Sequence, residues 1–249
     1  MTDWDPAEYG DQWAAMYDRI HTPSRVGTAK AVEALARLAK GGRVLELGIG
    51  TGRLALPLAA QGLEVCGIDA SEAMVAQLRA KPGGGTVPVV IGDFADACIE
   101  GRFDLVVLAL NTLFNAPTHD AQRRCVANAA RHLAEDGALV VEAFVPGMAA
   151  DQIACALDVE GIHVVLEATH HDLVTQQVRS ARVVIDERHG VQTLPVKIRY
   201  AWPSEIDLMA RLAGLDLADR WGGWSGEPFT CHSKAHVSIY RKRLLQAAP

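Results

Sequence analysis

A glycine-rich turn between an apolar strand and a helix constrains this chain more than any other feature. Residues 44–47 are apolar apart from Glu46 and lead into Gly48-Ile-Gly-Thr-Gly52. A second apolar segment, 63–68, ends in Asp69. Glycines let the backbone approach a ligand closely, and an acid at the end of the next strand can accept both hydroxyls of a ribose. The pattern therefore predicts a unit that binds the adenosine half of a cofactor.

The spacing of the glycines separates the two kinds of cofactor that use such a unit. A nicotinamide dinucleotide site has the pattern Gly-x-Gly-x-x-Gly, with a helix N-terminus facing the pyrophosphate. This chain has its third glycine one position earlier, at Gly52, and carries Glu46 just upstream. An acid directed into the loop suits a cationic ligand better than a pyrophosphate. A nicotinamide-dependent reductase is the alternative, although no Tyr-x-x-x-Lys proton donor accompanies the loop.

Three further segments follow this loop in a fixed order, each at the end of an apolar strand. They are 67–74, 91–94 and 103–112, and they contain Asp69, Asp93 and Asn111. Together with 46–53 they resemble the motifs of the class I S-adenosylmethionine-dependent methyltransferases, over residues 43 to 145. The resemblance implies S-adenosyl-L-methionine as cofactor, S-adenosyl-L-homocysteine as product, and a doubly wound, mostly parallel seven-stranded sheet of the Rossmann-like α/β type.

The resemblance also assigns cofactor contacts to positions of this chain. Glu46 would orient the loop or favour the cationic amino group, Asp69 would accept the ribose hydroxyls, and Asp93 would accept the adenine amino group. For Met74 and Phe94, ordinary core packing is the competing interpretation. The implied cofactor-binding residues are Tyr17, Glu46, Gly48, Ile49, Gly50, Gly52, Asp69, Ala70, Met74, Asp93, Phe94, Leu110 and Asn111.

Apolar periodicity predicts the order of the elements. Strands are expected at 43–48, 63–68, 87–91, 103–110 and 137–145, and helices at 51–61, 71–80 and 119–134. Continuous apolar strands indicate a sheet buried on both faces, and their alternation with helices indicates parallel strands.

The pattern changes after Pro146-Gly147. We expect a short helix at 151–159, then β-segments at 162–168, 174–186 and 191–201 with a turn at 187–190, a helix at 202–213, and strands near 215–221 and 235–241. This predicts an antiparallel β insert, 148–201, in a cofactor domain formed by 41–147 and 202–249. The layout resembles stand-alone methyltransferases of bacterial secondary metabolism, which carry such an insert after the fifth strand.

An aromatic helix face precedes the cofactor motifs. Tyr9, Trp13, Met16 and Tyr17 recur at helical spacing, and a second helix is expected over 24–40. Simple packing onto the domain is one interpretation. We favour the other, in which residues 1–40 form a helical lid over the cofactor.

Acceptor residues are harder to predict, because methyl transfer needs positioning rather than one universal catalytic group. Ligands of open α/β sheets bind at the carboxyl ends of the strands. Candidate catalytic residues are Asn111, Tyr17 and His119, although His119 also fits a helix start where it would merely be exposed. Candidate substrate contacts are Trp13, Asn115, Phe144, Tyr200 and Trp224. Trp224 could equally anchor the last two strands or an interface.

Composition excludes several other classes. The chain has 249 residues and a net charge of −6 with no basic stripe, which argues against a nucleic-acid substrate. No apolar run reaches the roughly 18 residues that a bilayer requires. The five cysteines lack Cys-x-x-Cys spacing, which indicates reduced thiols in a cytoplasmic protein, and no metal site is evident.

We predict a methyltransferase for a small-molecule acceptor, with a homodimer possible. The second alternative is a protein that binds the cofactor without transferring its methyl group.

Overall fold

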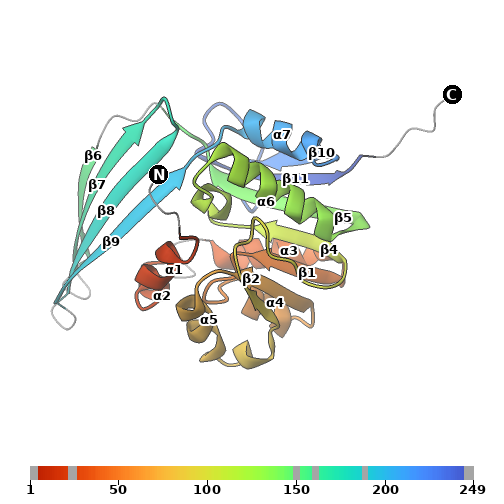
Figure 1. Ribbon diagram of the computed structural model, residues 1–249, viewed down its shortest axis with the longest axis horizontal. Helices are drawn as coiled ribbons and strands as arrows, with labels where there is room; N and C mark the ends of the chain where they lie inside the picture. Colours follow the sequence, from red (N-terminus) through yellow and green to blue (C-terminus); the bar gives the residue numbers. More distant parts are fainter. Residues whose placement is uncertain (1–4, 22–26, 148–151, 159–162, 187–189, 244–249) are drawn as a thin grey trace.

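The computed structural model describes residues 5–21, 27–147, 152–158, 163–186 and 190–243. For 152–158, His163 and Asp186 only the backbone is described. Two sheets form the architecture, a central one of seven strands and a second one of four (Figure 1).

The central sheet has the order β10-β11-β5-β4-β1-β2-β3. Its strands β1 to β5 run parallel, whereas β11 is antiparallel to both β5 and β10. The bounds are β1 Arg43–Leu47, β2 Glu64–Asp69, β3 Val89–Ile91, β4 Phe103–Leu108, β5 Leu133–Phe144, β10 Leu215–Trp221 and β11 Ala235–Lys242. This confirms the predicted doubly wound sheet of seven mostly parallel strands.

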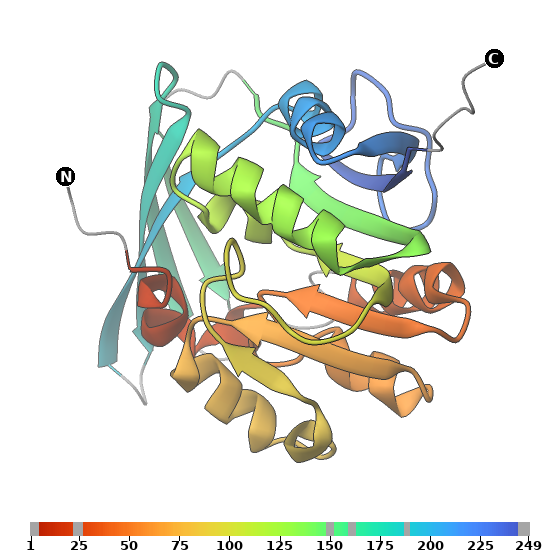
Figure 2. The same ribbon diagram turned by 45° about the vertical axis from the view of Figure 1, so that its right-hand side comes forward.

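Helices cover both faces of the central sheet, because its strands are apolar on both sides. In β4, Val106 and Leu108 face the core shared with α6 and α7, whereas Leu105 and Val107 face the core shared with α3 and α4. All four side chains are buried. The helices are α3 Thr28–Ala39, α4 Ala55–Ala60, α5 Glu72–Arg79, α6 His119–His132 and α7 Pro203–Leu212. Turned by 45°, the molecule shows the two layers on either side of the sheet (Figure 2).

The second sheet is an antiparallel meander in the order β6-β7-β8-β9, inserted between β5 and α7. Its strands are β6 Gln152–Asp158, β7 His163–Asp172, β8 Gln177–Asp186 and β9 Gly190–Arg199. The three predicted β-segments of the insert are confirmed as β7, β8 and β9. The predicted turn at 187–190 falls mostly outside the described residues.

The short helix predicted at 151–159 is wrong, because this segment forms β6. Its backbone pairs with β7 along its whole length, from Gln152 opposite Thr169 to Asp158 opposite His163. So short a segment has little helical stability of its own, and pairing with a neighbouring strand decides its conformation.

Two short N-terminal helices, α1 Glu8–Trp13 and α2 Tyr17–Ile20, lie between the second sheet and α5 (Figure 1). Trp13 is 2% exposed, packs in one cluster with Met74 of α5 and Leu194 of β9, and donates a hydrogen bond from Nε1 to the Pro195 carbonyl, 3.1 Å away. The N-terminal segment therefore contacts both halves of the molecule. Part of the predicted second helix, 24–26, lies outside the described residues, and α3 begins at Thr28.

A buried guanidinium anchors the second sheet to the central domain. Arg199, at the end of β9, is 8% exposed. It donates from Nη1 to Gln122 Oε1 of α6 (2.7 Å) and from Nη2 to Gln176 Oε1 (2.6 Å), and it pairs with Glu205 of α7 at 3.3 Å. The Gln122 amide donates back to the Arg199 carbonyl. This cluster fixes where β8 and β9 enter the domain.

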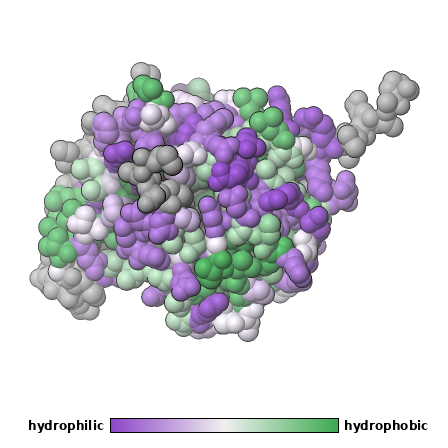
Figure 3. Space-filling view, viewed as in Figure 1, coloured by the Kyte–Doolittle hydropathy of each residue, from purple (hydrophilic) through white to green (hydrophobic). Residues whose placement is uncertain are grey.

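Polar residues are spread over most of the face that Figure 1 presents, with smaller apolar patches between them (Figure 3). None of the helices in the described part of the chain has the length and apolar character that a bilayer crossing requires.

Candidate active site

The glycine loop turns sharply at the carboxyl end of β1. Gly48, Gly50 and Gly52 all have positive φ, between 55° and 82°, which side chains adopt only with strain. The Gly48 amide donates to the Ile68 carbonyl of β2 at 2.7 Å. A Cβ on Gly48 would lie 2.6 Å from Cγ2 of Thr112, so only glycine fits where the loop faces the tip of β4. Because these glycines carry no side chains, a ligand can approach the backbone of the loop directly.

Asp69, at the end of β2, fixes this loop. Its Oδ2 accepts from the Gly50 amide at 2.7 Å, and its Oδ1 accepts from the Ser71 amide at 2.9 Å. Burial raises the pKa of the Asp69 carboxyl, and the two amide donors oppose that rise. The carboxylate therefore stands at the edge of a cavity, oriented by the strand end and by the loop.

Glu46 is a buried acid directly below the loop. It is 6% exposed, and its Oε2 has no hydrogen-bond partner among the described residues. Burial raises its pKa to about 8, nearby Arg53 lowers it, and nearby Asp69 raises it further. A buried carboxylate oxygen without a hydrogen-bond partner is costly until a partner arrives. This geometry fits a cationic ligand group.

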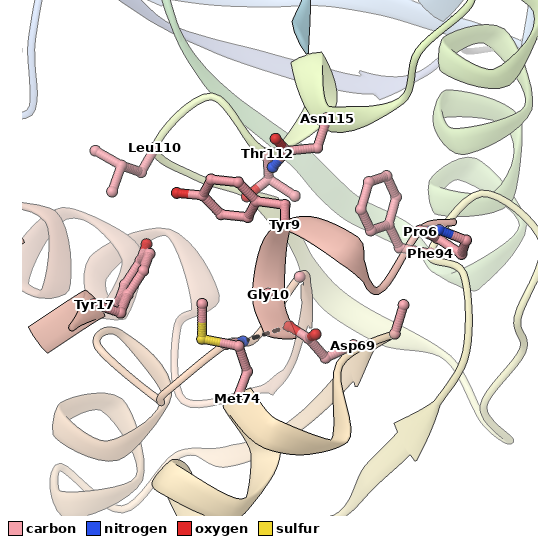
Figure 4. Close-up of a pocket in the computed structure, with 13 residues that line it drawn as sticks. Pro6, Tyr9, Gly10, Tyr17, Asp69, Met74, Phe94, Leu110, Thr112 and Asn115 are labelled. Carbon is pink, nitrogen blue, oxygen red and sulfur yellow. Dashed lines mark hydrogen bonds between the residues drawn. The ribbon is translucent and has the colours of Figure 1, made fainter. Parts of the chain in front are cut away.

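The first cavity lies over the carboxyl ends of β1, β2 and β4, beneath α1 (Figure 4). In that view Tyr9 of α1 lies between Tyr17 on one side and Phe94 on the other. The lining residues are Pro6, Tyr9, Gly10, Tyr17, Gly48, Gly50, Asp69, Ala70, Met74, Phe94, Leu110, Thr112 and Asn115. Nine of these were predicted as cofactor or substrate contacts, and Thr112 belongs to the predicted motif 103–112. Pro6, Tyr9 and Gly10 were not predicted as contacts.

A second cavity adjoins the first and reaches the inner face of the second sheet. Tyr9, Leu110 and Asn115 line both cavities, so the two share a wall. The second cavity is lined by Tyr9, Trp13, His21, Leu110, Asn111, Asn115, Glu167, Thr169, Val178, Ser180, Arg182, Val196 and Ile198. It brings together the predicted residues Trp13, Asn111 and Asn115.

An ion pair stands on the second-sheet wall of this cavity. Arg182 donates from Nε and Nη2 to Glu167 Oε2, at 3.1 and 2.7 Å, and the Ser180 hydroxyl donates to Glu167 Oε1 at 3.1 Å. The Arg182 guanidinium also lies 5.6 Å from the centre of the Trp13 ring. The only carboxylate in this lining is therefore neutralised, and the remaining wall is apolar or uncharged.

The tip of β4 has a strained backbone that β5 holds in place. Leu110 and Asn111 have φ values of 50° and 65°, an uncommon conformation for leucine. The Leu110 amide donates to Glu142 Oε2 at 2.7 Å, and Asn111 Oδ1 accepts from the Phe144 amide at 2.7 Å. Trp224 Nε1 donates to the other Glu142 oxygen at 2.6 Å. Phe144 and Trp224, predicted as substrate contacts, thus buttress the tip and line neither cavity.

Several other predicted residues lie away from both cavities. His119 is exposed in the first turn of α6, and Tyr200 is buried against Trp202, with ring centres 6.4 Å apart. Asp93 accepts from the Ala95 amide in the loop after β3. The predicted cofactor contacts Glu46, Ile49 and Gly52 line neither cavity. Within the described residues, no group of three or more His, Cys, Asp or Glu side chains could hold a metal ion.

The residues that the sequence did not predict come mainly from α1 and the second sheet. Tyr9 lies one helical turn before Trp13, with ring centres 5.3 Å apart, and this spacing was the only local signal for it. No sequence pattern marked Glu167, Ser180 or Arg182 as site residues, because their approach to α1 depends on how the second sheet packs against the rest of the molecule.

Comparisons with known proteins agree with this geometry. Residues 44–137 match a family model described as a methyltransferase domain. The solved structure of the CcbJ methyltransferase from Streptomyces caelestis is 36% identical, covers 97% of this chain and 100% of its own, and superposes with a TM-score of 0.89. A cypemycin N-terminal methyltransferase from Streptomyces is 29% identical over 249 residues, which is 96% of this chain and 99% of the relative. An N,N-dimethyltransferase for a dTDP-4-amino sugar from Saccharopolyspora spinosa is 33% identical over 140 residues, which is 54% of this chain and 55% of the relative.

Proposed function

The chain belongs to the class I S-adenosylmethionine-dependent methyltransferases, and from that premise we propose that it methylates an amine nitrogen of a small natural product. The first cavity holds the cofactor in this proposal, and the second cavity holds the acceptor. The observation that carries the proposal is their shared wall, Tyr9, Leu110 and Asn115, which brings the two ligands side by side.

The residues of the first cavity fit S-adenosylmethionine. Glu46 does not line the cavity, but its buried Oε2 has no partner among the described residues and would attract the cationic amino group. The uncovered glycine loop gives room for the methionine and ribose portions, and Asp69 presents carboxylate oxygens to the ribose hydroxyls. When bound, the cofactor supplies an electrophilic methyl group on a sulfonium. In our assignment Met74 and Phe94 flank the adenine, and Tyr17 and Leu110 lie near the reacting end.

The lining of the second cavity supports a neutral amine as the acceptor. Only the neutral amine has a lone pair with which to form the new bond, and a free carboxylate nearby would hold it as an ammonium. Glu167 cannot act in this way because Arg182 and Ser180 already engage it. The amino-sugar relative is named an N,N-dimethyltransferase, and the cypemycin relative is named an N-terminal methyltransferase.

We assign the N-terminal residues 1–40 as a lid, residues 41–147 and 202–249 as the cofactor domain, and residues 148–201 as the acceptor insert. Two polar contacts support the lid. The Ser71 hydroxyl donates to Asp11 Oδ1 at 2.6 Å, and the Thr51 hydroxyl donates to Asp18 Oδ1 at 2.6 Å. Thr51 belongs to the glycine loop and Ser71 lies two positions after Asp69, so both contacts join the N-terminal helices to elements of the cofactor site, and the helices can close on bound cofactor and exclude water.

A cytoplasmic location is our further assignment, supported by the free thiols of the four cysteines whose side chains are described. We also keep a homodimer as a proposal, to be measured by light scattering.

The test is methyl transfer from radiolabelled S-adenosylmethionine to matched pairs of acceptors. The amines are cyclohexylamine, benzylamine and the dTDP-amino sugar of the relative, and the controls carry a hydroxyl in place of each amino group. We expect labelled product from amines alone, with a mass gain of one methylene unit. Transfer to the hydroxyl compounds but not to the amines would refute N-methylation. Binding of S-adenosylhomocysteine without transfer to any acceptor would favour a cofactor-binding protein.

A further inference from the structure

His21 lies where the two cavities meet. It follows α2 and lines the second cavity. Its ring centre lies 4.7 Å from that of Tyr17, which lines the first cavity, and 5.7 Å from that of Trp13, which lines the second. These two aromatic contacts fix the plane of the imidazole at the junction between the cofactor and the acceptor.

The ring nitrogens of His21 are left for a ligand. The backbone amide of His21 donates to the Tyr17 carbonyl at 2.8 Å, but no group among the described residues hydrogen-bonds to either ring nitrogen. A polar ring in a largely enclosed place normally finds a partner. Because this ring borders the second cavity, an acceptor molecule can provide that partner.

The imidazole is neutral at physiological pH. Burial lowers the pKa of His21 to about 4, and the positive charges of Arg182 on β8 and Arg53 after the glycine loop lower it too. Of the other titratable groups around it, Glu167 is paired with Arg182, and burial raises the pKa of Tyr17 to about 12. One ring nitrogen therefore carries a lone pair that can accept a hydrogen bond.

We propose that His21 accepts a hydrogen bond from an N–H of the acceptor amine and thereby turns the nitrogen lone pair toward the methyl donor. This inference rests on the proposed function and narrows the acceptor class to primary and secondary amines. The nitrogen forms the new N–C bond with its lone pair, the electrons of the C–S bond remain on sulfur, and the surplus N–H proton leaves through His21 to solvent. A tertiary amine has no N–H to offer, so methylation ends there without a quaternary ammonium product.

Two substitutions separate this role from simple packing. His21→Phe keeps an aromatic ring between Trp13 and Tyr17 but removes the hydrogen-bond acceptor, and His21→Gln keeps an acceptor without the ring. His232→Phe is the matched control, because His232 is exposed in a loop and lines neither cavity. Far-ultraviolet circular dichroism and melting temperature identify variants that fail to fold.

The readouts are kcat/KM for cyclohexylamine and for its N-methyl derivative, and the Kd of S-adenosylhomocysteine by calorimetry. We expect His21→Phe to lower kcat/KM about 10-fold, the loss of one hydrogen bond, with an unchanged Kd. His21→Gln should retain more activity than His21→Phe, and N,N-dimethylcyclohexylamine should not be methylated by the wild type.

Wild-type kcat/KM in His21→Phe would overturn the assignment, as would a quaternary product or an equal loss of S-adenosylhomocysteine affinity. Each of these results leaves N-methylation by the wild type intact. If the wild type methylates the hydroxyl controls instead of the amines, the proposed function itself fails.

Discussion

Replacing Glu46 by glutamine should stabilise the free protein while weakening its hold on the cofactor. Glutamine has nearly the same shape but cannot carry a charge. The Glu46 carboxyl has a pKa of about 8 in the folded chain against an ordinary value of 4.5. Each unit of difference corresponds to about 1.4 kcal/mol, so the charged form costs the folded state at most about 5 kcal/mol.

The pH dependence follows from the direction of this difference. Between about pH 4.5 and pH 8 the folded protein binds a proton at Glu46 that the unfolded chain does not. The free energy of unfolding therefore falls as the pH rises through this window. We expect Glu46→Gln to exceed the wild type by less than about 1 kcal/mol at pH 5, by about 3 kcal/mol at pH 7, and by somewhat more at pH 8.5.

Urea unfolding at these three pH values measures the effect, and Glu100→Gln, at an exposed position, is the control. Calorimetry of S-adenosylhomocysteine binding in two buffers of different ionisation enthalpy adds a second readout. At pH 7 the wild type should release a proton when the cationic amino group arrives, and Glu46→Gln should release none and bind more weakly. A stability difference that does not change with pH would refute the reasoning.

Three other substitutions probe the elements around the site. Gly10→Ala should raise the Kd of S-adenosylhomocysteine about 10-fold, because its Cβ would lie 2.4 Å from the Ser71 Cβ and unseat α1; an unchanged Kd would show that α1 does not cover the cofactor. Asp18→Ala removes the ion pair with Lys81 and the acceptor of the Thr51 hydroxyl; because Asp18 is exposed and Lys81 is only partly buried, calorimetry should show a rise of no more than about fivefold in Kd. Arg199→Met should cost about 3 kcal/mol in urea unfolding and lower kcat/KM for the acceptor more than the affinity for S-adenosylhomocysteine, and equal losses in both would argue against a separate anchor for the second sheet.

The central sheet could be predicted because its signals are local. A short apolar run such as Leu105–Leu108, bounded by polar or glycine-containing segments, indicates a strand buried on both faces. The glycine loop indicates a strand before it and a helix after it. The strand β6 could not be predicted, because the composition of 152–158 suits helix and strand alike and only the pairing with β7 decides between them.

In the candidate site, too, residues near the motif in the sequence could be predicted, and residues brought together by the fold could not. Asp69 and Glu46 stand at fixed distances from the glycine loop in the sequence, so their places follow from the motif. The second cavity joins residues far apart in the chain, as in the hydrogen bond between Trp13 and Pro195, 182 positions away. Tyr200 and Trp224 were predicted as acceptor contacts because aromatic side chains often line pockets. They also pack in protein cores, and the sequence alone does not show whether such a side chain faces a pocket or the core.

The alternation of side chains along β8 and β9 has a consequence for how such an enzyme diverges. Val178, Ser180 and Arg182 on β8, and Val196 and Ile198 on β9, line the second cavity at every other position, so their neighbours in sequence point to the opposite face. Mutation at these five positions can reshape the wall of the second cavity, our proposed acceptor site, while the cofactor loop stays untouched. Natural selection, or a combinatorial library of the same five codons, can thus explore new acceptors without rebuilding the methyl-donor half of the molecule.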